Sequence, residues 1–415
     1  MTIETDVLII GGGIAGASAA YHLTALGHRV VLLERGDVAS GASGVNAGQI
    51  DSVGWGHAPD LQAHLTAGSV EIFERVQLDH GEDIEFRRSG ALQAVRTGEE
   101  YEFTRDRVAA LRARGHTVEL LTIREARAIE PALSPALLGA MFSPLRSQAD
   151  PVKATRAFAR LAEREGARVL TQHEVKALSP RSTSGYAAST SRGEVAAGAV
   201  VIAAGAWSAS IGAMLDLDVP IVPVRGQMWA TAPAPPCLFQ TMSAAESALA
   251  WHRDRGGAPP DLTHRDGLRV TRHLYGRQRR DGELIFGGDR EVCGWDTTPD
   301  PSGIETNRGH VIELLPFLSA LPVARTWAGL MPFSLDGRPL IGRVPGRDDL
   351  WIVSGLASSG FGRGPAAGKL LADYLHSGVP APVLADADPI GRIRERGAVS
   401  TPRIVDHADE RAARG

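Results

Sequence analysis

The sequence is poor in cysteine and in aromatic residues. It has two cysteines among 415 residues, Cys237 and Cys293, and aromatic side chains make up 5% of the chain. The two cysteines lie far apart and form no Cys-x-x-Cys motif, so neither a disulfide framework nor a zinc site is implied. The 13 histidines also lack the spacing of a metal site. We therefore expect no bound metal.

Long apolar runs and an excess of one charge are lacking too. No apolar run approaches the ~18 residues of a membrane helix, and the net charge is −4 with both signs mixed. This balance gives no electrostatic footprint for nucleic acid or for an anionic membrane. The first apolar segment follows Asp6 at once, which leaves no room for a signal peptide. We expect a cytoplasmic protein with no membrane span and no nucleic-acid partner.

Glycine, in contrast, is abundant, with 47 residues. Asp6 leads the apolar residues 7–10, which run directly into residues 11–16, Gly-Gly-Gly-Ile-Ala-Gly. A strand that enters a Gly-x-Gly-x-x-Gly turn and then a helix holds a dinucleotide pyrophosphate. Gly11 permits the tight turn, Gly13 lets the backbone approach the phosphates, and Gly16 lets the helix pack on the strand. The helix N-terminus favours the phosphate charge.

The residues that follow complete a βαβ unit. Small residues over 14–26 predict a helix, and residues 29–33 predict a second strand. That strand ends in Glu34, 23 positions after the first glycine, where an acidic residue binds the adenosine ribose hydroxyls. A carboxylate there would repel the extra phosphate of NADP, so NAD or FAD is favoured. An ordinary βαβ unit with a glycine turn is the less favoured alternative.

Hydrophobic periodicity divides the rest of the chain into further elements. Helices are predicted over about 60–79, 99–113, 151–166 and 365–376, and strands over 199–205, 224–231, 283–288 and 350–354. The continuous apolar run of the first of these strands suits a parallel sheet that is covered on both faces.

The predicted fold class is therefore α/β. We expect a Rossmann-like nucleotide-binding domain with a parallel sheet, and a second, mainly antiparallel α+β substrate domain. The first domain is discontinuous and comprises residues 1–85, 146–220 and 323–396. The second comprises residues 86–145 and 221–322, and residues 397–415 form a C-terminal tail.

Several separated motifs follow the glycine turn in a fixed order. They are Gly41-Ala42-Ser43, Gly90-Ala91-Leu92, Asp150-Pro151, the strand and turn at 200–208, Pro223-Val224-Arg225-Gly226-Gln227, residues 327–332 with Asp336-Gly337, and Gly360-Phe361-Gly362. Over residues 5 to about 394, the chain resembles the FAD-dependent D-amino acid oxidase superfamily, particularly its glycine oxidase and sarcosine oxidase branch.

The resemblance implies FAD as the cofactor. The implied cofactor-binding residues are Gly11, Gly13, Ile14, Ala15, Gly16, Glu34, Arg35, Ser43, Gly48, Gln49, Ile50, Val175, Gly205, Gly360, Phe361 and Gly362. Backbone N–H groups after Gly362 would stabilise the negative charge of the reduced flavin. Relatives that attach the flavin covalently use a cysteine or a histidine, where this chain has Gly329 and residues 45–48. The FAD should therefore be non-covalent.

The implied activity is that of an amine or amino acid oxidase or dehydrogenase. Hydride would pass from the carbon next to nitrogen to flavin N5 and give an imine. The nitrogen lone pair drives this step, so the site needs a neutral amine, a close pose and an anchor for the substrate carboxylate. Arginine is the usual anchor because its planar fork donates two hydrogen bonds.

Glycine oxidases carry arginine where this chain has Met331, and again near Ser358, so the anchor is expected elsewhere. The candidate substrate or catalytic residues are Arg363, Arg277, Tyr275 and His252. Each also has a structural interpretation: a loop or phosphate contact for Arg363, a strand surface for Arg277 and Tyr275, and a loop histidine for His252. Arg225 either bonds a neighbouring loop or contacts substrate.

Two alternatives remain open at this stage. One is a 2-hydroxy acid or alcohol dehydrogenase of the same superfamily, which needs a base for the hydroxyl proton. The other is a flavin-binding subunit that works only inside a larger dehydrogenase complex. The sequence also leaves open whether O2 or another acceptor takes the electrons, and whether the chain forms a homo-oligomer.

Overall fold

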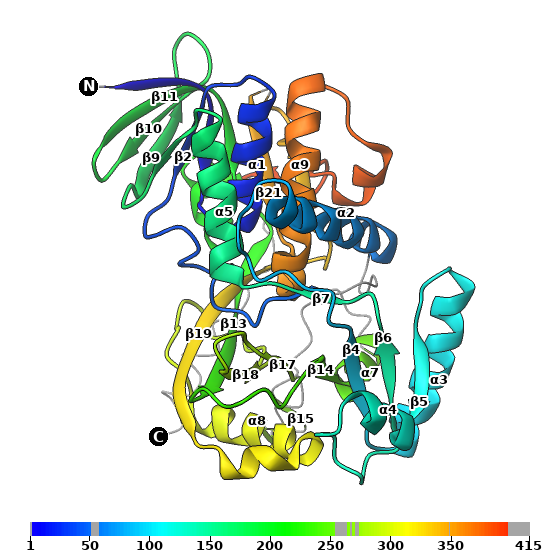
Figure 1. Ribbon diagram of the computed structural model, residues 1–415. Helices are drawn as coiled ribbons and strands as arrows, with labels where there is room; N and C mark the ends of the chain where they lie inside the picture. The colour runs from blue at the N-terminus through cyan, green and yellow to red at the C-terminus, as the bar shows by residue number, and fades with distance from the viewer. Residues whose placement is uncertain are drawn as a thin grey trace, which may run out of the picture.

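The computed structural model describes residues 2–50, 58–253, 264–265, 268–269, 274–347 and 349–396. Two eight-stranded sheets organise this part of the chain, one above the other in Figure 1. Among the helices of the described ranges, none has an apolar stretch long enough to cross a bilayer.

The first sheet is the nucleotide-binding sheet that the sequence predicts. Its strand order is β20-β21-β11-β1-β2-β8, and the hairpin β9–β10 adds to β11. The strands are β1 (Ile3–Ile10), β2 (Val30–Leu33), β8 (Arg168–Leu170), β9 (Val175–Pro180), β10 (Tyr186–Thr190), β11 (Gly193–Ile202), β20 (Leu340–Arg343) and β21 (Leu350–Ser354). The five strands β8, β2, β1, β11 and β21 pair in parallel. Their apolar sequences follow from this position, because both faces of the sheet are covered.

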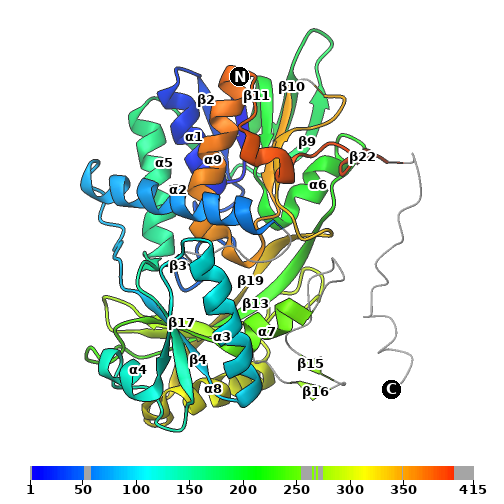
Figure 2. The ribbon, with the colours of Figure 1, turned by 90° about the vertical axis from the view of Figure 1, so that its right-hand side faces the viewer.

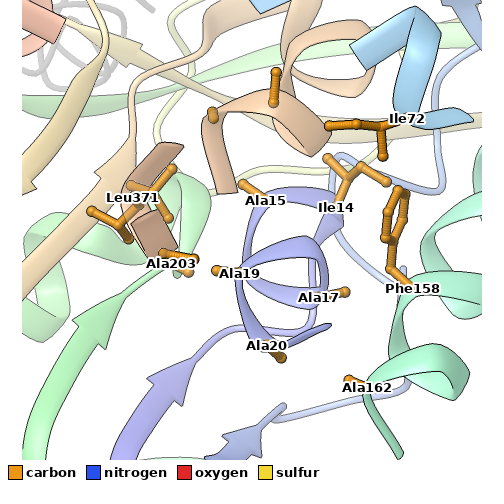
Figure 3. Packing of buried hydrophobic residues seen from close by; sticks show 14 of the residues in the cluster. Ile14, Ala15, Ala17, Ala19, Ala20, Ile72, Phe158, Ala162, Ala203 and Leu371 are labelled. Carbon is orange, nitrogen blue, oxygen red and sulfur yellow. The ribbon is translucent and has the colours of Figure 1, made fainter. Parts of the chain in front are cut away.

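Helices α1 (Ile14–Ala25), α5 (Pro151–Arg164) and α9 (Gly360–Ser377) cover one face of this sheet, and α2 (Pro59–Leu78) packs across α9 (Figures 1 and 2). Figure 3 shows the small side chains of α1 between Phe158 of α5 and Leu371 of α9. A Cβ atom at Gly368 would lie 2.5 Å from the Ala15 carbonyl oxygen, so glycine is what allows α9 to approach α1. The close packing brings the N-termini of both helices to the same end of the sheet.

Helix α9 begins at Gly360, earlier than the predicted start at about residue 365. From the sequence, residues 355–364 were expected to form a loop before the helix, because glycine has a low intrinsic helix propensity. Tertiary packing outweighs that propensity here. The Ser18 hydroxyl of α1 donates a hydrogen bond to the Pro365 carbonyl oxygen at 2.8 Å, and Ser69 Oγ of α2 accepts one from the Ala366 N–H at 3.0 Å.

The second sheet is mainly antiparallel, with the order β19-β13-β18-β17-β14-β4-β6-β5. Its strands are β4 (Ala91–Val95), β5 (Glu119–Thr122), β6 (Gly139–Ser143), β13 (Ile221–Thr231), β14 (Thr241–Ala244), β17 (Tyr275–Gln278), β18 (Leu284–Gly287) and β19 (Val323–Ser334). Helices α3 (Gly98–Ala113), α4 (Ile123–Ile129), α7 (Ala245–Arg253) and α8 (Pro301–Leu314) belong to this half of the chain. Strand β19 pairs with β13 along its length, although the predicted limits gave residues 323–334 to the nucleotide domain. The other domain limits stay predictions.

Short elements complete the described chain. They are β3 (Gln49–Ile50) paired with β7 (Ser147–Gln148), β12 (Leu217–Asp218) paired with β22 (Arg394–Glu395), β15 (His264–Arg265) paired with β16 (Leu268–Arg269), α6 (Ser208–Ala213), and the 3-10 turns at Gly205–Trp207, Pro316–Ala320, Ala357–Ser359 and Pro382–Ala387. The pair β3–β7 lies between the two sheets (Figures 1 and 2).

Candidate active site

A cavity joins the two halves of the chain. On one side it reaches the carboxyl ends of β1, β11 and β21, where open parallel sheets bind ligands. On the other side it is lined by Gly226, Gln227, Met228, Tyr275, Asp289, Arg290, Leu330, Met331 and Pro332 of the antiparallel sheet and its loops. A ligand in this cavity would therefore contact both the glycine turn and the second sheet.

The glycine turn opens into this cavity. Gly11 has a φ of +120°, and a Cβ atom there would overlap the Ala203 carbonyl oxygen, so the turn requires glycine. The Ile14 N–H of α1 donates to Ser43 Oγ at 2.9 Å. The N-cap residue of α1, Gly13, offers no capping side chain, and the first turn of α1 has no acidic residue. The positive end of the helix is therefore available to an anion.

The start of α9 supplies a second such end. Gly360 and Phe361 line the same cavity, and the first turn of α9 also lacks an acidic residue and a side-chain cap. Two helix N-termini thus face one cavity, which favours a ligand with negative charge at two places. FAD fits this arrangement, because it carries a pyrophosphate and gains negative charge on the flavin when it is reduced.

Glu34 closes the turn from the end of β2. Its Oε2 accepts a hydrogen bond from the Gly12 N–H and its Oε1 accepts one from the Gly36 N–H, both at 2.8 Å. The carboxylate lines the cavity as well. Glu34 therefore holds the backbone of the glycine turn at Gly12 and of its own loop at Gly36. The sequence predicts a ribose contact in addition.

The wall beside Glu34 contains an aromatic stack. The Arg35 guanidinium lies 3.6 Å from the centre of the Trp207 ring, and Trp207 stacks on Trp295 with ring centres 5.4 Å apart. Arg35 and Trp207 line the cavity. Sequence reasoning had placed Trp207 only at the end of a strand, and its position just after Gly205 was the available signal.

The segment 45–50 is held by the second sheet. Trp327 Nε1 donates to the Val45 carbonyl oxygen at 2.8 Å, and Arg277 Nε donates to the Ala47 carbonyl oxygen. Gln49 lines the cavity, whereas Ile50 is fully buried in β3 and Gly48 lies against Ala149. Strands β17 and β19 of the second sheet therefore position this segment.

The predicted cofactor residues divide into two sets. Those that line the cavity are Gly11, Gly13, Ile14, Ala15, Glu34, Arg35, Ser43, Gln49, Val175, Gly205, Gly360 and Phe361. Gly16, Gly48, Ile50 and Gly362 do not, because they pack against neighbouring backbone or side chains: Gly16 against Gly11 and Ala203, and Gly362 against Ile50. These four residues therefore lie behind the lining of the cavity and not in it.

Two of the predicted substrate residues do not reach the cavity. Arg277 is 1% exposed, and its guanidinium also donates to Gln148 Oε1 at 2.9 Å and to the Ala149 carbonyl oxygen at 3.1 Å. Burial lowers the pKa of Arg277 to about 10. Arg363 is 2% exposed inside α9, where its Nε lies 3.4 Å from Thr66 Oγ1 of α2. Both arginines therefore join elements together, which corrects the expectation that either one faces the substrate.

The other two candidates have different outcomes. Tyr275 lines the cavity, and burial raises the pKa of its hydroxyl. His252 lies in α7, and its side chain falls outside the described part of the structure. Within the described ranges, no group of three or more His, Cys, Asp or Glu side chains is placed to hold a metal ion.

The charged pair that sequence reasoning missed is Asp289 and Arg290. Both line the cavity directly after β18, and they are 2% and 5% exposed. Burial lowers the pKa of Arg290 to about 9, and the nearby Tyr275 opposes this shift. The available signal was a charged pair that follows a buried strand through two glycines, Gly287 and Gly288.

Arg225 bonds a neighbouring loop, the first of its two expected roles. Its guanidinium donates to Glu291 Oε2 at 2.6 Å, to Asp296 Oδ2 at 3.0 Å and to the Thr298 carbonyl oxygen at 2.9 Å. We call residues 288–300 the β18–α8 loop. Arg225 thus fixes this loop just beyond Arg290.

Comparisons with known proteins agree with these features. The model of the DAO family, described as FAD dependent oxidoreductase, matches residues 6–374. A glycine oxidase of Pseudomonas aeruginosa is 30% identical, and the match covers 93% of this chain and 99% of the relative. The crystal structure of glycine oxidase from Geobacillus kaustophilus aligns with a TM-score of 0.80 at 28% identity, covering 93% of this chain and 98% of that one. L-proline dehydrogenase from P. horikoshii aligns with a TM-score of 0.80 at 26% identity, covering 94% and 98%.

Proposed function

The chain belongs to the DAO family of FAD-dependent oxidoreductases, and from that premise we propose that it oxidises a carbon–nitrogen bond of an amino acid or a secondary amine. FAD is the cofactor and accepts two electrons from the substrate. The product would be an imine, formed as hydride leaves the carbon next to nitrogen.

The residues at the two ends of the cavity would have different roles, cofactor binding at one end and substrate binding at the other. Glu34 and Arg35 would hold the adenosine, and the α1 N-terminus with Ser43 would hold the pyrophosphate. The start of α9 would stabilise negative charge on the reduced cofactor. Tyr275 and the neighbouring residues of the second sheet would orient the substrate at the other end.

One observation carries this proposal. A single cavity extends from two helix N-termini that suit an anionic dinucleotide to the compartment at the second sheet, where Met228, Leu330 and Met331 are among the lining residues. A small amine fits that compartment, because apolar walls favour the neutral amine from which hydride can leave.

The test is anaerobic bleaching of the flavin in the purified holoenzyme. A panel of glycine, N-methylated glycines, proline and 2-hydroxy acids is added, and absorbance of the oxidised flavin is followed. Bleaching by an amino acid or amine supports the proposal. Bleaching by hydroxy acids alone would overturn it in favour of the alcohol dehydrogenase alternative. A holoenzyme that no member of the panel bleaches, but that gains activity in a larger assembly, would favour the complex-subunit alternative.

A further inference from the structure

We propose that Arg290, assisted by Tyr275, binds the carboxylate of the substrate. The inference deepens the proposed function, on which the identity of the ligand as an amino acid rests. It predicts that this protein selects substrates with a free carboxylate and discriminates against neutral amines of the same size.

The position of Arg290 separates it from the dinucleotide end of the cavity. Among the described residues that line the cavity, the arginines are Arg35 and Arg290. Arg35 stacks on Trp207 beside Glu34 at the nucleotide-binding sheet, whereas Arg290 follows β18 of the second sheet. A second anion in the cavity would therefore meet Arg290 rather than Arg35.

The surroundings of Arg290 suit a carboxylate. Arg290 is almost fully buried, and Met228 and Met331 are apolar residues that line the same cavity. A charge-assisted, bidentate pair is strengthened where water is excluded, and the planar guanidinium matches the geometry of a carboxylate. Tyr275 lines the same cavity and opposes the lowering of the Arg290 pKa, and its hydroxyl can donate a further hydrogen bond.

The β18–α8 loop holds Arg290 from both sides. Asp289 accepts a hydrogen bond from the Gln227 side chain, and Gln227 Oε1 accepts one from the Asp300 N–H at 2.6 Å. After Arg290, the backbone of Glu291 pairs with Arg225 through two hydrogen bonds of 2.8 and 3.0 Å. An anchor whose backbone is fixed on each side loses little freedom when it binds its ligand. Arg225 is therefore a positioning residue for Arg290.

The experiment measures binding of a non-reactive carboxylate to the oxidised holoenzyme. Acetate and its neutral counterpart acetamide are titrated while the visible spectrum of bound FAD and the Tm are recorded. The proteins are wild type, R290Q, R290K, Y275F and R280Q; Arg280 is an exposed residue that pairs with Asp83 and serves as the control. Neither readout requires turnover.

We expect saturable binding of acetate and none of acetamide. R290Q should weaken acetate binding at least tenfold, which corresponds to about 1.4 kcal/mol. R290K should bind acetate with an affinity between those of wild type and R290Q, because it keeps the charge but loses the planar fork of the guanidinium. R280Q should bind acetate as tightly as wild type. Acetate affinity in R290Q equal to that of wild type would overturn the inference, as would a wild type that binds no carboxylate. If R290Q does not retain FAD, unchanged acetate affinity in both R290K and Y275F would overturn it.

The outcome is distinguishable from failure of the proposed function. Loss of acetate binding in R290Q, together with a wild-type flavin that no amine bleaches, would keep the anchor and reject amine oxidation. Equal bleaching of wild type and R290Q by amino acids would keep amine oxidation and reject the anchor. The variant R225K should raise KM for a carboxylate substrate more than it lowers kcat, because it displaces Arg290 without touching the substrate.

Discussion

Glu34 has two separable roles, and a short series of variants distinguishes them. Its carboxylate accepts two hydrogen bonds of 2.8 Å from the Gly12 and Gly36 N–H groups, and by prediction it also binds the ribose hydroxyls. Hydrogen bonds to a charged group contribute about 1.5–3 kcal/mol each. In the apoprotein, water can replace part of the two backbone bonds, so Glu34→Ala should destabilise it by about 1–2 kcal/mol. Loss of the ribose bonds should weaken FAD binding at least tenfold.

The assay measures both quantities on the same proteins. Apoprotein stability is taken from urea unfolding, and FAD affinity from reconstitution followed by flavin fluorescence. Glu34→Gln keeps one acceptor oxygen and should give intermediate values, while Asp37→Ala, an exposed carboxylate nearby that does not line the cavity, is the control. If Glu34→Ala destabilises the apoprotein but leaves FAD affinity within about threefold of wild type, the carboxylate only braces the turn and the ribose role is refuted.

Two further predictions concern the cofactor linkage and acid stability. FAD should be released into the supernatant on acid precipitation, because Val45 fills the space in which a side chain at Gly329 would stand; flavin retained in the protein pellet would contradict this. Burial lowers the pKa of His22 to about 4 from 6.5. Between these pH values the unfolded chain binds a proton at His22, whereas the folded chain does not. Stability should fall by about 2.5 kcal/mol as the pH drops from about 6.5 to 4. His22→Gln should flatten this dependence in urea unfolding at several pH values, the exposed His64→Gln should not, and an unchanged slope in His22→Gln would rule the histidine out.

The dinucleotide half of the site could be predicted from sequence because its chemistry is local. The turn needs Gly11 at a positive φ, and Glu34 ends the strand that follows the first helix, so spacing along the chain fixes both. The parallel sheet follows from continuous apolar runs such as β11 in the same way. The comparisons confirm the family and the cofactor that were predicted from these residues.

The start of α9 and the role of Arg363 could not be predicted, because long-range packing decides both. Glycines normally disfavour a helix, but here they let α9 lie against α1. Once residues 360–364 are helical, Arg363 lies on the side of α9 that faces α2 rather than the cavity. The sequence analysis began the helix at about residue 365, so Arg363 was expected in the loop before it. In a loop, no helical period determines on which side the Arg363 side chain lies.

The predicted substrate half shows why a missing anchor is easier to notice from the sequence than the residue that we propose in its place. Met331 lies on β19, and a resemblance reveals that its position holds no arginine. Arg290 comes from the loop after β18, where it follows Asp289. Met331 and the backbone of Asp289 both lie against Gly226 of β13: a Cβ atom there would lie 3.0 Å from Met331 Cε and 3.3 Å from the Asp289 carbonyl oxygen. Strand β13 pairs with β19 on one side and with β18 on the other, so the two positions are neighbours only through a strand between them. That neighbourhood depends on sheet order, which spacing along the chain does not encode. It would let Arg290, in the loop after β18, supply the cation that β19 lacks at Met331.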